Sequence, residues 1–330
     1  MKVYRYRQSP IELHGVPFFQ ETGRLERLSA EMREKMPNLD FLGRRCPGAR
    51  VCFRTNSKKL DVKIVYETVN FDIGMSMYSG QSAYVYIGER TKARYAGLVF
   101  PKEQLNSRYA QRTFEKSGEM EDVVIWLPRN DILADIQIGL DEDAQLLAPT
   151  PYRHPVPILY YGSSITEGGC CSKSANCYNA LISQWLDVDY YNFGFSGSAR
   201  GELVMADYIN TIEKSIFVMD YDHNAPTVEH LAATHEPFFQ RIREASPNLP
   251  VVFVSMPDFG NGKEARRRAV IRATYENALA AGDRNVYFVD GGEFFPPEMQ
   301  ALCSNDNTHP NDLGFYLMAK KIAPVIEKLL

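Results

Sequence analysis

Hydrophobic and polar positions alternate with a period of two along the first half of the chain, between residues 50 and 138. The alternating runs are rich in β-branched and aromatic residues, which is typical of half-buried antiparallel strands. A helical pattern stands before them at residues 25–36. Many strands with few helices predict an all-β sandwich of the jelly-roll kind. We expect its strands at residues 51–55, 60–66, 83–87, 123–127 and 134–138.

After residue 156 the pattern changes to short apolar runs separated by longer helical stretches. This alternation predicts a three-layer α/β/α domain, in which helices cover both faces of a parallel sheet. In such open sheets, ligands bind at the carboxyl ends of the strands. We expect strands at residues 158–161, 188–193, 215–219, 251–255 and 286–289, and helices at 178–185, 227–245, 264–281 and about 311–330.

The two patterns meet at residues 147–157, where four prolines fall within eleven residues. A proline-rich stretch is extended and stiff, as in an interdomain linker. The sequence therefore predicts a β-sandwich domain at residues 1–150 and an α/β domain at residues 151–330.

Composition and charge narrow the function classes. The chain has 330 residues, a net charge of −4 and a pI of about 5.9, which argues against a nucleic-acid partner or an anionic membrane surface. No apolar run reaches the roughly 18 residues of a membrane span. The first residues lack the apolar segment of a secretion signal, so we expect a cytoplasmic protein. Whether the protein forms a homo-oligomer stays open.

Six cysteines raise the alternative of a metal site, because Cys170, Cys171 and Cys177 lie close together in the sequence. Zinc-binding cysteines commonly come in paired CxxC motifs or with a nearby histidine, and this cluster has neither. We therefore expect buried thiols under a neighbouring loop, and neither a metal nor an organic cofactor.

A glycine-flanked serine pair follows the first apolar run of the second half, in the segment YYGSSITEG at residues 160–168. A serine at such a strand end faces a cleft rather than a core. Serine is a weak nucleophile until a base removes its proton, so this interpretation requires a histidine that an acid orients.

The segment DNTHP at residues 306–310 offers that base. Asp306 and His309 are three residues apart, and on a tight turn the carboxylate can reach one ring nitrogen and leave the other for a serine hydroxyl. Pro310 is the expected first residue of the last helix. The alternative is a surface turn in which the aspartate only caps the backbone.

Two further loops could stabilise a developing oxyanion. The segment NFGFSGS at residues 192–198 has glycines that allow a backbone N–H to approach a substrate closely. The segment DYDHNAP at residues 220–226 offers the side-chain amide of Asn224. His223 competes for the role of base, but no acid stands at comparable spacing downstream of it.

Taken in order, these four blocks resemble the SGNH hydrolase superfamily, also called GDSL esterases, over about residues 156–330. The resemblance implies Ser164 as the nucleophile, with its own N–H in the oxyanion hole. It implies Gly197 and Asn224 as the other oxyanion donors, and Asp306 and His309 as acid and base. The chain departs from the family pattern at Ser163, which replaces the name-giving aspartate, and at residues 222–224, which replace the usual glycine-bearing third block.

The form of the serine block and the β-rich first half resemble two-domain carbohydrate acetylesterases with an N-terminal jelly roll. The resemblance implies a serine esterase that removes small acyl groups, above all acetyl, from carbohydrate hydroxyls. Asp258 and Phe259, in a loop after a strand, and Tyr161 are the candidates for substrate contact.

Two alternatives stay open. An acyltransferase acting on a small hydroxylated acceptor would use the same catalytic residues. A catalytically silent sugar-binding protein would have the same fold without the activity. The presence of every catalytic block argues against this alternative. A lipase is disfavoured, because the sequence suggests no apolar lid or interfacial helix.

Overall fold

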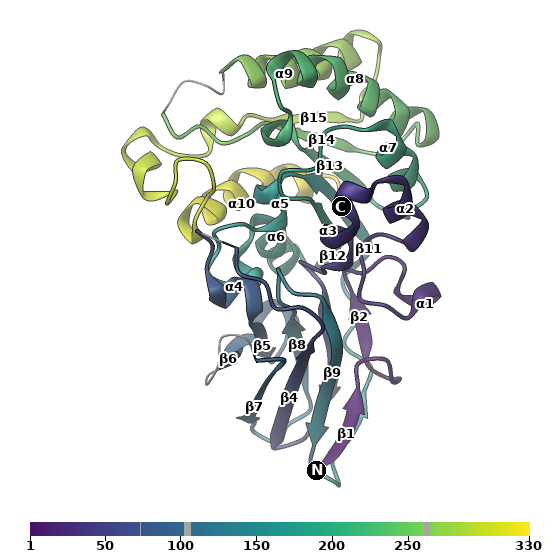
Figure 1. Cartoon of the computed structure of the whole chain (residues 1–330), viewed down its shortest axis with the longest axis vertical. Helices are drawn as coiled ribbons and strands as arrows, with labels where there is room; N and C mark the ends of the chain where they lie inside the picture. Colours follow the sequence, from purple (N-terminus) through teal and green to yellow (C-terminus); the bar gives the residue numbers. More distant parts are fainter. Residues whose placement is uncertain (73, 102–106, 261–264) are drawn as a thin grey trace. The chain divides into compact units, whose positions relative to one another are not determined.

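The computed structural model of the chain describes residues 1–72, 74–101, 107–260 and 265–330 (Figure 1). Its contacts divide the chain into two compact units. The first comprises Met1–Pro155 with Cys171–Ala175, and the second comprises Val156–Cys170 with Asn176–Leu330. The predicted domain boundary between residues 150 and 151 stays a prediction.

The first unit is built from two antiparallel sheets. One sheet has the order β1-β9-β4-β7, and the other has the order β10-β3-β8-β5-β6 with β2 paired to β3. The strands are β1 (Lys2–Arg5), β2 (Glu12–His14), β3 (Arg50–Thr55), β4 (Lys59–Tyr66), β5 (Ala83–Ile87), β6 (Arg94–Val99), β7 (Tyr109–Glu115), β8 (Glu121–Trp126), β9 (Leu133–Leu140) and β10 (Leu146–Leu147). The helical segments are α1 (Phe19–Thr22), α2 (Ala30–Lys35), η1 (Pro37–Leu39), α3 (Asp40–Arg44), α4 (Met77–Gln81) and η2 (Arg90–Lys92).

Alternation along the strands places apolar side chains between the two sheets. On β4, for example, Leu60, Val62 and Ile64 are fully buried, and they belong to one core cluster with Val51 and Phe53 of β3. The predicted all-β sandwich is therefore confirmed.

The second unit contains a sheet of order β12-β11-β13-β14-β15, in which β11, β13, β14 and β15 pair in parallel. Its strands are β11 (His154–Gly162), β12 (Val188–Gly194), β13 (Ile216–Asp220), β14 (Val251–Val254) and β15 (Val286–Val289). Its helical segments are α5 (Ser164–Glu167), α6 (Tyr178–Leu186), α7 (Leu203–Asn210), η4 (Asp222–Asn224), α8 (Val228–Ala245), α9 (Ala265–Ala280), η5 (Gly291–Glu293), η6 (Pro297–Leu302) and α10 (Asp312–Glu327); η3 (Ser174–Asn176) spans the change of unit.

Two neighbouring tyrosines of β11 show that helices cover both faces of this sheet. Tyr160 packs edge-on against Tyr178 of α6, and Tyr161 stacks on Phe238 of α8 at a ring distance of 5.0 Å. Successive side chains of a strand point to opposite faces, so α6 and α8 lie on opposite sides of β11. The predicted α/β/α fold with a parallel sheet is confirmed.

The predicted helix at residues 25–36 is wrong at its start, because α2 begins only at Ala30. The side chain of Ser29 caps α2 by accepting a hydrogen bond from the Met32 N–H at 3.2 Å. The N–H groups of Arg27 and Leu28 donate to the Gly43 carbonyl instead of joining a helix. The apolar residues of this segment are spaced as in a helix because they are buried, although the chain before Ala30 is irregular.

The start of the last helix also differs from the prediction. α10 begins at Asp312, and Asn311 is its N-cap, since the Asn311 side chain accepts hydrogen bonds from the N–H groups of Leu313 and Gly314. Pro310 instead forms an isolated bridge with Ser304. Residue 264, where a further helix was expected to begin, lies outside the described residues, and α9 is described from Ala265.

A buried histidine between α8 and α9 makes the second unit sensitive to acid. His235 is 1% exposed, and its Nδ1 lies 2.8 Å from the Thr274 hydroxyl. Burial lowers the pKa of His235 from 6.5 to about 3. The unfolded chain therefore binds one more proton than the folded chain between these pH values, and the free energy of unfolding falls as pH drops below 6.5.

We expect His235→Leu to weaken this acid dependence by about 1.4 kcal/mol per pH unit between pH 6 and pH 4. The measurement is urea unfolding followed by circular dichroism across that range. His230→Gln, a change on the same helix, is the matched control and should keep the wild-type slope. An unchanged slope in His235→Leu would mean that His235 is protonated in the folded protein.

Candidate functional site

The serine pair lies where β11 ends and the short helix α5 begins. Gly162 closes the strand in a space that admits no side chain, because a Cβ there would lie 2.0 Å from the Thr166 Oγ1 and 2.3 Å from the Asp220 carbonyl oxygen. The chain can turn sharply into α5 only with glycine at this position. Ser164 is the first residue of α5, so its backbone N–H has no acceptor one turn earlier in the helix.

Ser163, which stands where the family has an aspartate, caps this helix. Its side-chain oxygen accepts a hydrogen bond from the Ile165 N–H at 3.1 Å. Serine and aspartate are both favoured at this capping position. The departure from the family pattern therefore keeps the physical support of the turn.

The structure brings Ser164, His309 and Asp306 together in one chain of hydrogen bonds. The Ser164 Oγ lies 2.8 Å from the His309 Nε2, and the His309 Nδ1 lies 2.7 Å from the Asp306 Oδ2. Ser164 is only 4% exposed. The arrangement has the geometry by which a serine can pass its proton to an imidazole that a carboxylate orients.

The turn that carries the histidine is fixed by its own aspartate. The Asp306 Oδ1 accepts hydrogen bonds from the backbone N–H of His309 at 2.7 Å and of Thr308 at 3.0 Å. Asn307 takes a left-handed conformation with φ of 57°, which asparagine tolerates better than most residues. Burial alone would raise the pKa of Asp306, but the hydrogen bonds and charge of His309 lower it to about 2, so the carboxylate stays ionised.

The glycine loop after β12 lies against α5. Its Ser196 N–H donates to the Glu167 Oε2 at 3.0 Å. Gly197 has φ of +67°, in the left-handed region that favours glycine. The backbone N–H of Gly197 is thereby carried on a turn that is tied to the helix of Ser164.

Asn224 joins this arrangement from the end of η4. Its Nδ2 donates to the Phe195 carbonyl at 2.8 Å, which leaves the second amide hydrogen for another acceptor. Arg267 of α9 stabilises the same turn, because its guanidinium donates hydrogen bonds to the carbonyls of Asp222 and Ala225. Three loops distant in sequence are therefore linked by hydrogen bonds around the serine turn.

His223 lies beside His309, the predicted base. Its ring centroid is 6.2 Å from that of His309. Burial above all, with the electrostatic effects of His309 and Arg267, lowers the pKa of His223 to about 4. At neutral pH this side chain is uncharged.

The predicted substrate contacts are less well placed. Tyr161 is fully buried and stacks on Phe238, while its hydroxyl accepts a hydrogen bond from the Gly201 N–H at 3.2 Å. Tyr161 thus packs in the core under α8, which does not fit a substrate contact. The Asp258 carboxylate pairs with Arg268 at 2.8 Å, and Phe259 packs against Phe295. Both side chains are only partly exposed.

A buried polar network under α5 was not found by sequence reasoning. The Asp220 Oδ2 accepts hydrogen bonds from the Thr166 hydroxyl at 2.9 Å and from the Tyr178 hydroxyl at 2.8 Å. Burial and the nearby Asp222 raise the pKa of Asp220 well above its usual range. An aspartate at the end of an otherwise apolar strand was the available signal in the sequence.

One group of possible metal ligands lies at the site. Among the described residues, Cys170, Asp306 and His309 each offer a ligand atom within 4.8 Å of the others. Cys171 and Cys177, the other members of the cysteine cluster considered from the sequence, do not belong to this group.

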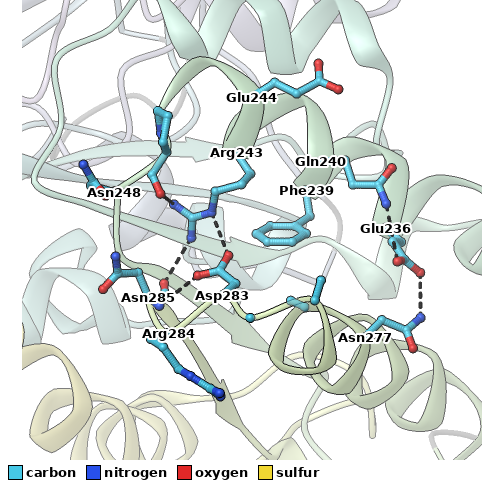
Figure 2. Close-up of a pocket in the computed structure, with 14 residues that line it drawn as sticks. Glu236, Phe239, Gln240, Arg243, Glu244, Asn248, Asn277, Asp283, Arg284 and Asn285 are labelled. Carbon is cyan, nitrogen blue, oxygen red and sulfur yellow. Dashed lines mark hydrogen bonds and ion pairs between the residues drawn. The ribbon is translucent and has the colours of Figure 1, made fainter.

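A cavity of about 710 Å³ lies apart from the serine turn, where α8 and α9 end (Figure 2). The Arg243 guanidinium donates to the Asp283 carboxylate and to the carbonyls of Ser246, Pro247, Leu249 and Asn285. Through these hydrogen bonds Arg243 stabilises the two turns that precede β14 and β15, at the amino ends of these strands. In open parallel sheets the ligand binds at the opposite, carboxyl edge, so we assign this cavity no role in the chemistry.

Within the described ranges, no helix combines the length and the apolar character needed to cross a lipid bilayer.

Comparison with known proteins returns two family models and many structures. Residues 156–327 match the GDSL-like lipase/acylhydrolase family, and residues 1–146 match the N-terminal domain of SGNH-hydrolase-type esterases. No curated protein matches the chain in sequence.

Three solved structures illustrate the fold likeness. A protein described as a GDSL-like lipase from Bacteroides ovatus ATCC 8483 is 23% identical, with a TM-score of 0.88 over 99% of this chain and 97% of that one. The salicylyl-acyltransferase SsfX3 from a tetracycline biosynthetic pathway is 20% identical, with a TM-score of 0.79 over 98% and 97%. A family two carbohydrate esterase from Clostridium thermocellum is 16% identical, with a TM-score of 0.61 over 86% and 92%.

The family model for the catalytic half covers more than half of the chain, and it spans the serine turn, the glycine loop, the Asn224 turn and the Asp306–His309 turn. The model for the first half matches the β-sandwich unit. The predicted superfamily is confirmed, and the chain belongs to the GDSL-like lipase/acylhydrolase family, as an esterase of the SGNH type with an N-terminal β-sandwich domain.

Proposed function

We propose that the protein is a serine esterase that hydrolyses small acyl esters, above all acetyl esters, on carbohydrate hydroxyls. The observation that carries the proposal is the hydrogen-bond chain from the Ser164 Oγ through the His309 ring to the Asp306 carboxylate. A hydroxyl, an imidazole and an ionised acid in this order can cleave an ester through an acyl-enzyme.

In this mechanism the His309 Nε2 takes the Ser164 proton as the hydroxyl oxygen attacks the ester carbonyl carbon. Asp306 accepts the Nδ1–H, fixes the tautomer and stabilises the imidazolium that forms. His309 then protonates the leaving alcohol, which departs and leaves an acyl-serine. A water molecule repeats the sequence, with His309 again as base, and releases the carboxylic acid.

The tetrahedral oxyanion would be held by the backbone N–H groups of Ser164 and Gly197 and by the side-chain amide of Asn224. The left-handed turn at Gly197 and the bond from Asn224 to the Phe195 carbonyl support this assignment. Donors that are fixed before the reaction need no reorganisation as charge develops on the substrate oxygen. The chemistry requires neither a metal nor an organic cofactor.

The choice of an acylated carbohydrate rests on fold likeness to carbohydrate esterases, including the Clostridium thermocellum enzyme and an acetyl xylan esterase from Butyrivibrio proteoclasticus. The second candidate is transfer of the acyl group to a small hydroxylated acceptor. The likeness to a salicylyl-acyltransferase over almost the whole chain favours it. Both reactions pass through the same acyl-serine and differ only in the second nucleophile.

Ser164→Ala is expected to lower kcat for p-nitrophenyl acetate by several orders of magnitude, on the order of 10⁴- to 10⁶-fold. The reason is that alanine cannot form the acyl-enzyme. Ser163→Ala is the matched control, since it removes the neighbouring hydroxyl and should cost only about 1 kcal/mol of stability through the lost cap. If the wild type were inactive, or Ser164→Ala as active as wild type, the esterase proposal would fail and a silent sugar-binding protein would be favoured.

Asn224→Ala is expected to lower kcat by about 100- to 1000-fold, because one oxyanion donor is lost while nucleophile and base remain. Asn210→Ala removes an asparagine whose side chain donates to the Arg241 carbonyl, and it should leave kcat unchanged. The measurement is steady-state kinetics with p-nitrophenyl acetate on variants of equal thermal stability. A kcat for Asn224→Ala within a factor of three of wild type would remove Asn224 from this role.

Hydrolysis and transfer are separated by following both products. With p-nitrophenyl acetate and an added sugar or glycerol, an esterase releases acetate in the same amount as p-nitrophenol. A transferase releases less acetate, and the shortfall appears as acetylated acceptor by mass spectrometry. We expect equal amounts; a shortfall of more than half would favour the transferase.

A further inference from the structure

The thiol of Cys170 lies next to the catalytic base. Cys170 comes three residues after the end of α5, and Asp306 and His309 come from the turn before α10. A ligand atom of each residue nevertheless lies within 4.8 Å of the other two. Cys170 is 9% exposed and His309 has 18% of its side chain exposed, whereas Asp306 has 46%, so the cluster is reachable from solvent on the side of its carboxylate.

The three side chains form a set that suits zinc-like ions. A thiolate, an imidazole and a carboxylate are all ligands of Zn²⁺, whereas Mg²⁺ and Ca²⁺ prefer oxygen ligands alone. Three protein ligands with an open fourth position are typical of accessible zinc sites. Neighbouring ligand atoms of tetrahedral zinc are roughly 3.5 Å apart, as follows from metal–ligand bonds of about 2.0–2.3 Å. The three ligand atoms lie within 4.8 Å of one another, so side-chain movements on the order of 1 Å bring them to this spacing.

The backbone at Cys170 gives an independent reason to assign its side chain a role. Its φ is +64°, in the left-handed region, where a residue with a Cβ is disfavoured by about 1–2 kcal/mol. Gly168, which ends α5 with φ of +99°, takes the same region at no such cost. Such strain at non-glycine residues collects at functional sites.

We propose that Cys170, Asp306 and His309 form an inhibitory site for a thiophilic divalent cation of the Zn²⁺ class. The ion binds the Cys170 sulfur, an Asp306 oxygen and one ring nitrogen of His309, and the thiol proton passes to solvent. No electrons are transferred. The proposal rests on the proposed function, because it assigns the regulated step to the base of that reaction.

Either ring nitrogen gives the same result. An ion on Nε2 occupies the lone pair that must take the Ser164 proton. An ion on Nδ1 displaces the proton that links the imidazole to Asp306. That proton then sits on Nε2, which has no lone pair left for the Ser164 proton. In both cases the serine is left without its base, and removal of the ion restores activity.

The first experiment tests binding without any use of activity. Co²⁺ is titrated into the full chain under reducing conditions, and the near-ultraviolet thiolate-to-cobalt charge-transfer absorption is recorded. We expect the band in the wild type at one Co²⁺ per chain, its loss in Cys170→Ser, and its retention in the control Cys171→Ser. Absence of the band in the wild type, or its persistence in Cys170→Ser, would overturn the site.

The second experiment links the site to catalysis. Zn²⁺ should inhibit p-nitrophenyl acetate hydrolysis by the wild type, and EDTA should reverse the inhibition. In Cys170→Ser, the Zn²⁺ concentration for half-inhibition, measured against the zinc-free rate of that variant, should rise by about 10-fold or more. Equal sensitivity in both proteins contradicts the proposal. A wild type without esterase activity would instead contradict the proposed function, while the cobalt spectra still decide the metal site.

Discussion

The close approach at Gly162 is the constraint on which the site depends. The end of β11, the Asp220 carbonyl of the neighbouring strand and the Thr166 side chain meet where a Cβ would need to stand. The direction in which the chain leaves β11 is therefore fixed, and α5 begins at Ser164. A second absent Cβ acts in the same way at Gly194, where it would lie 2.1 Å from the Glu167 backbone nitrogen. The two glycines thus allow α5 to pack closely against the sheet and against the end of β12.

This close packing buries polar groups around α5, and the buried groups form hydrogen bonds with one another. The Thr166 carbonyl near the end of α5 accepts hydrogen bonds from the side-chain amides of Asn179 at 2.8 Å and Asn192 at 2.9 Å. Below them the Asp220 carboxyl is bonded to the hydroxyls of Thr166 and Tyr178. A buried polar group without a partner costs about 1–3 kcal/mol, so this network favours one placement of α5 over others. The position of the serine is set by a rigid polar layer rather than by a flexible loop.

Much of this arrangement could be predicted from the sequence, and the exceptions have physical causes. Buried parallel strands such as β15 are continuous apolar runs and are easy to locate. The edge strand β7 was missed, because only Ala110 and Phe114 of its residues are buried and its pattern reads as polar. Tyr161 looked like a cleft residue because it lies near the serine, but strand alternation turns it under α8. The proximity of Cys170 to His309 is set by the tertiary fold. The local sequence around either residue therefore could not predict it.

The exposure of the acid suggests how the dyad acts. Asp306 has 46% of its side chain exposed, and an ion pair in contact with water contributes little energy. Its oxygens are nevertheless fixed, because one binds the His309 ring and the other binds two backbone N–H groups of the same turn. In the proposed mechanism, the principal contribution of Asp306 is therefore to orient the imidazole. An ion that entered between these groups would gain the same fixed carboxylate, so the geometry that would orient the proposed base would also suit the proposed inhibitory metal.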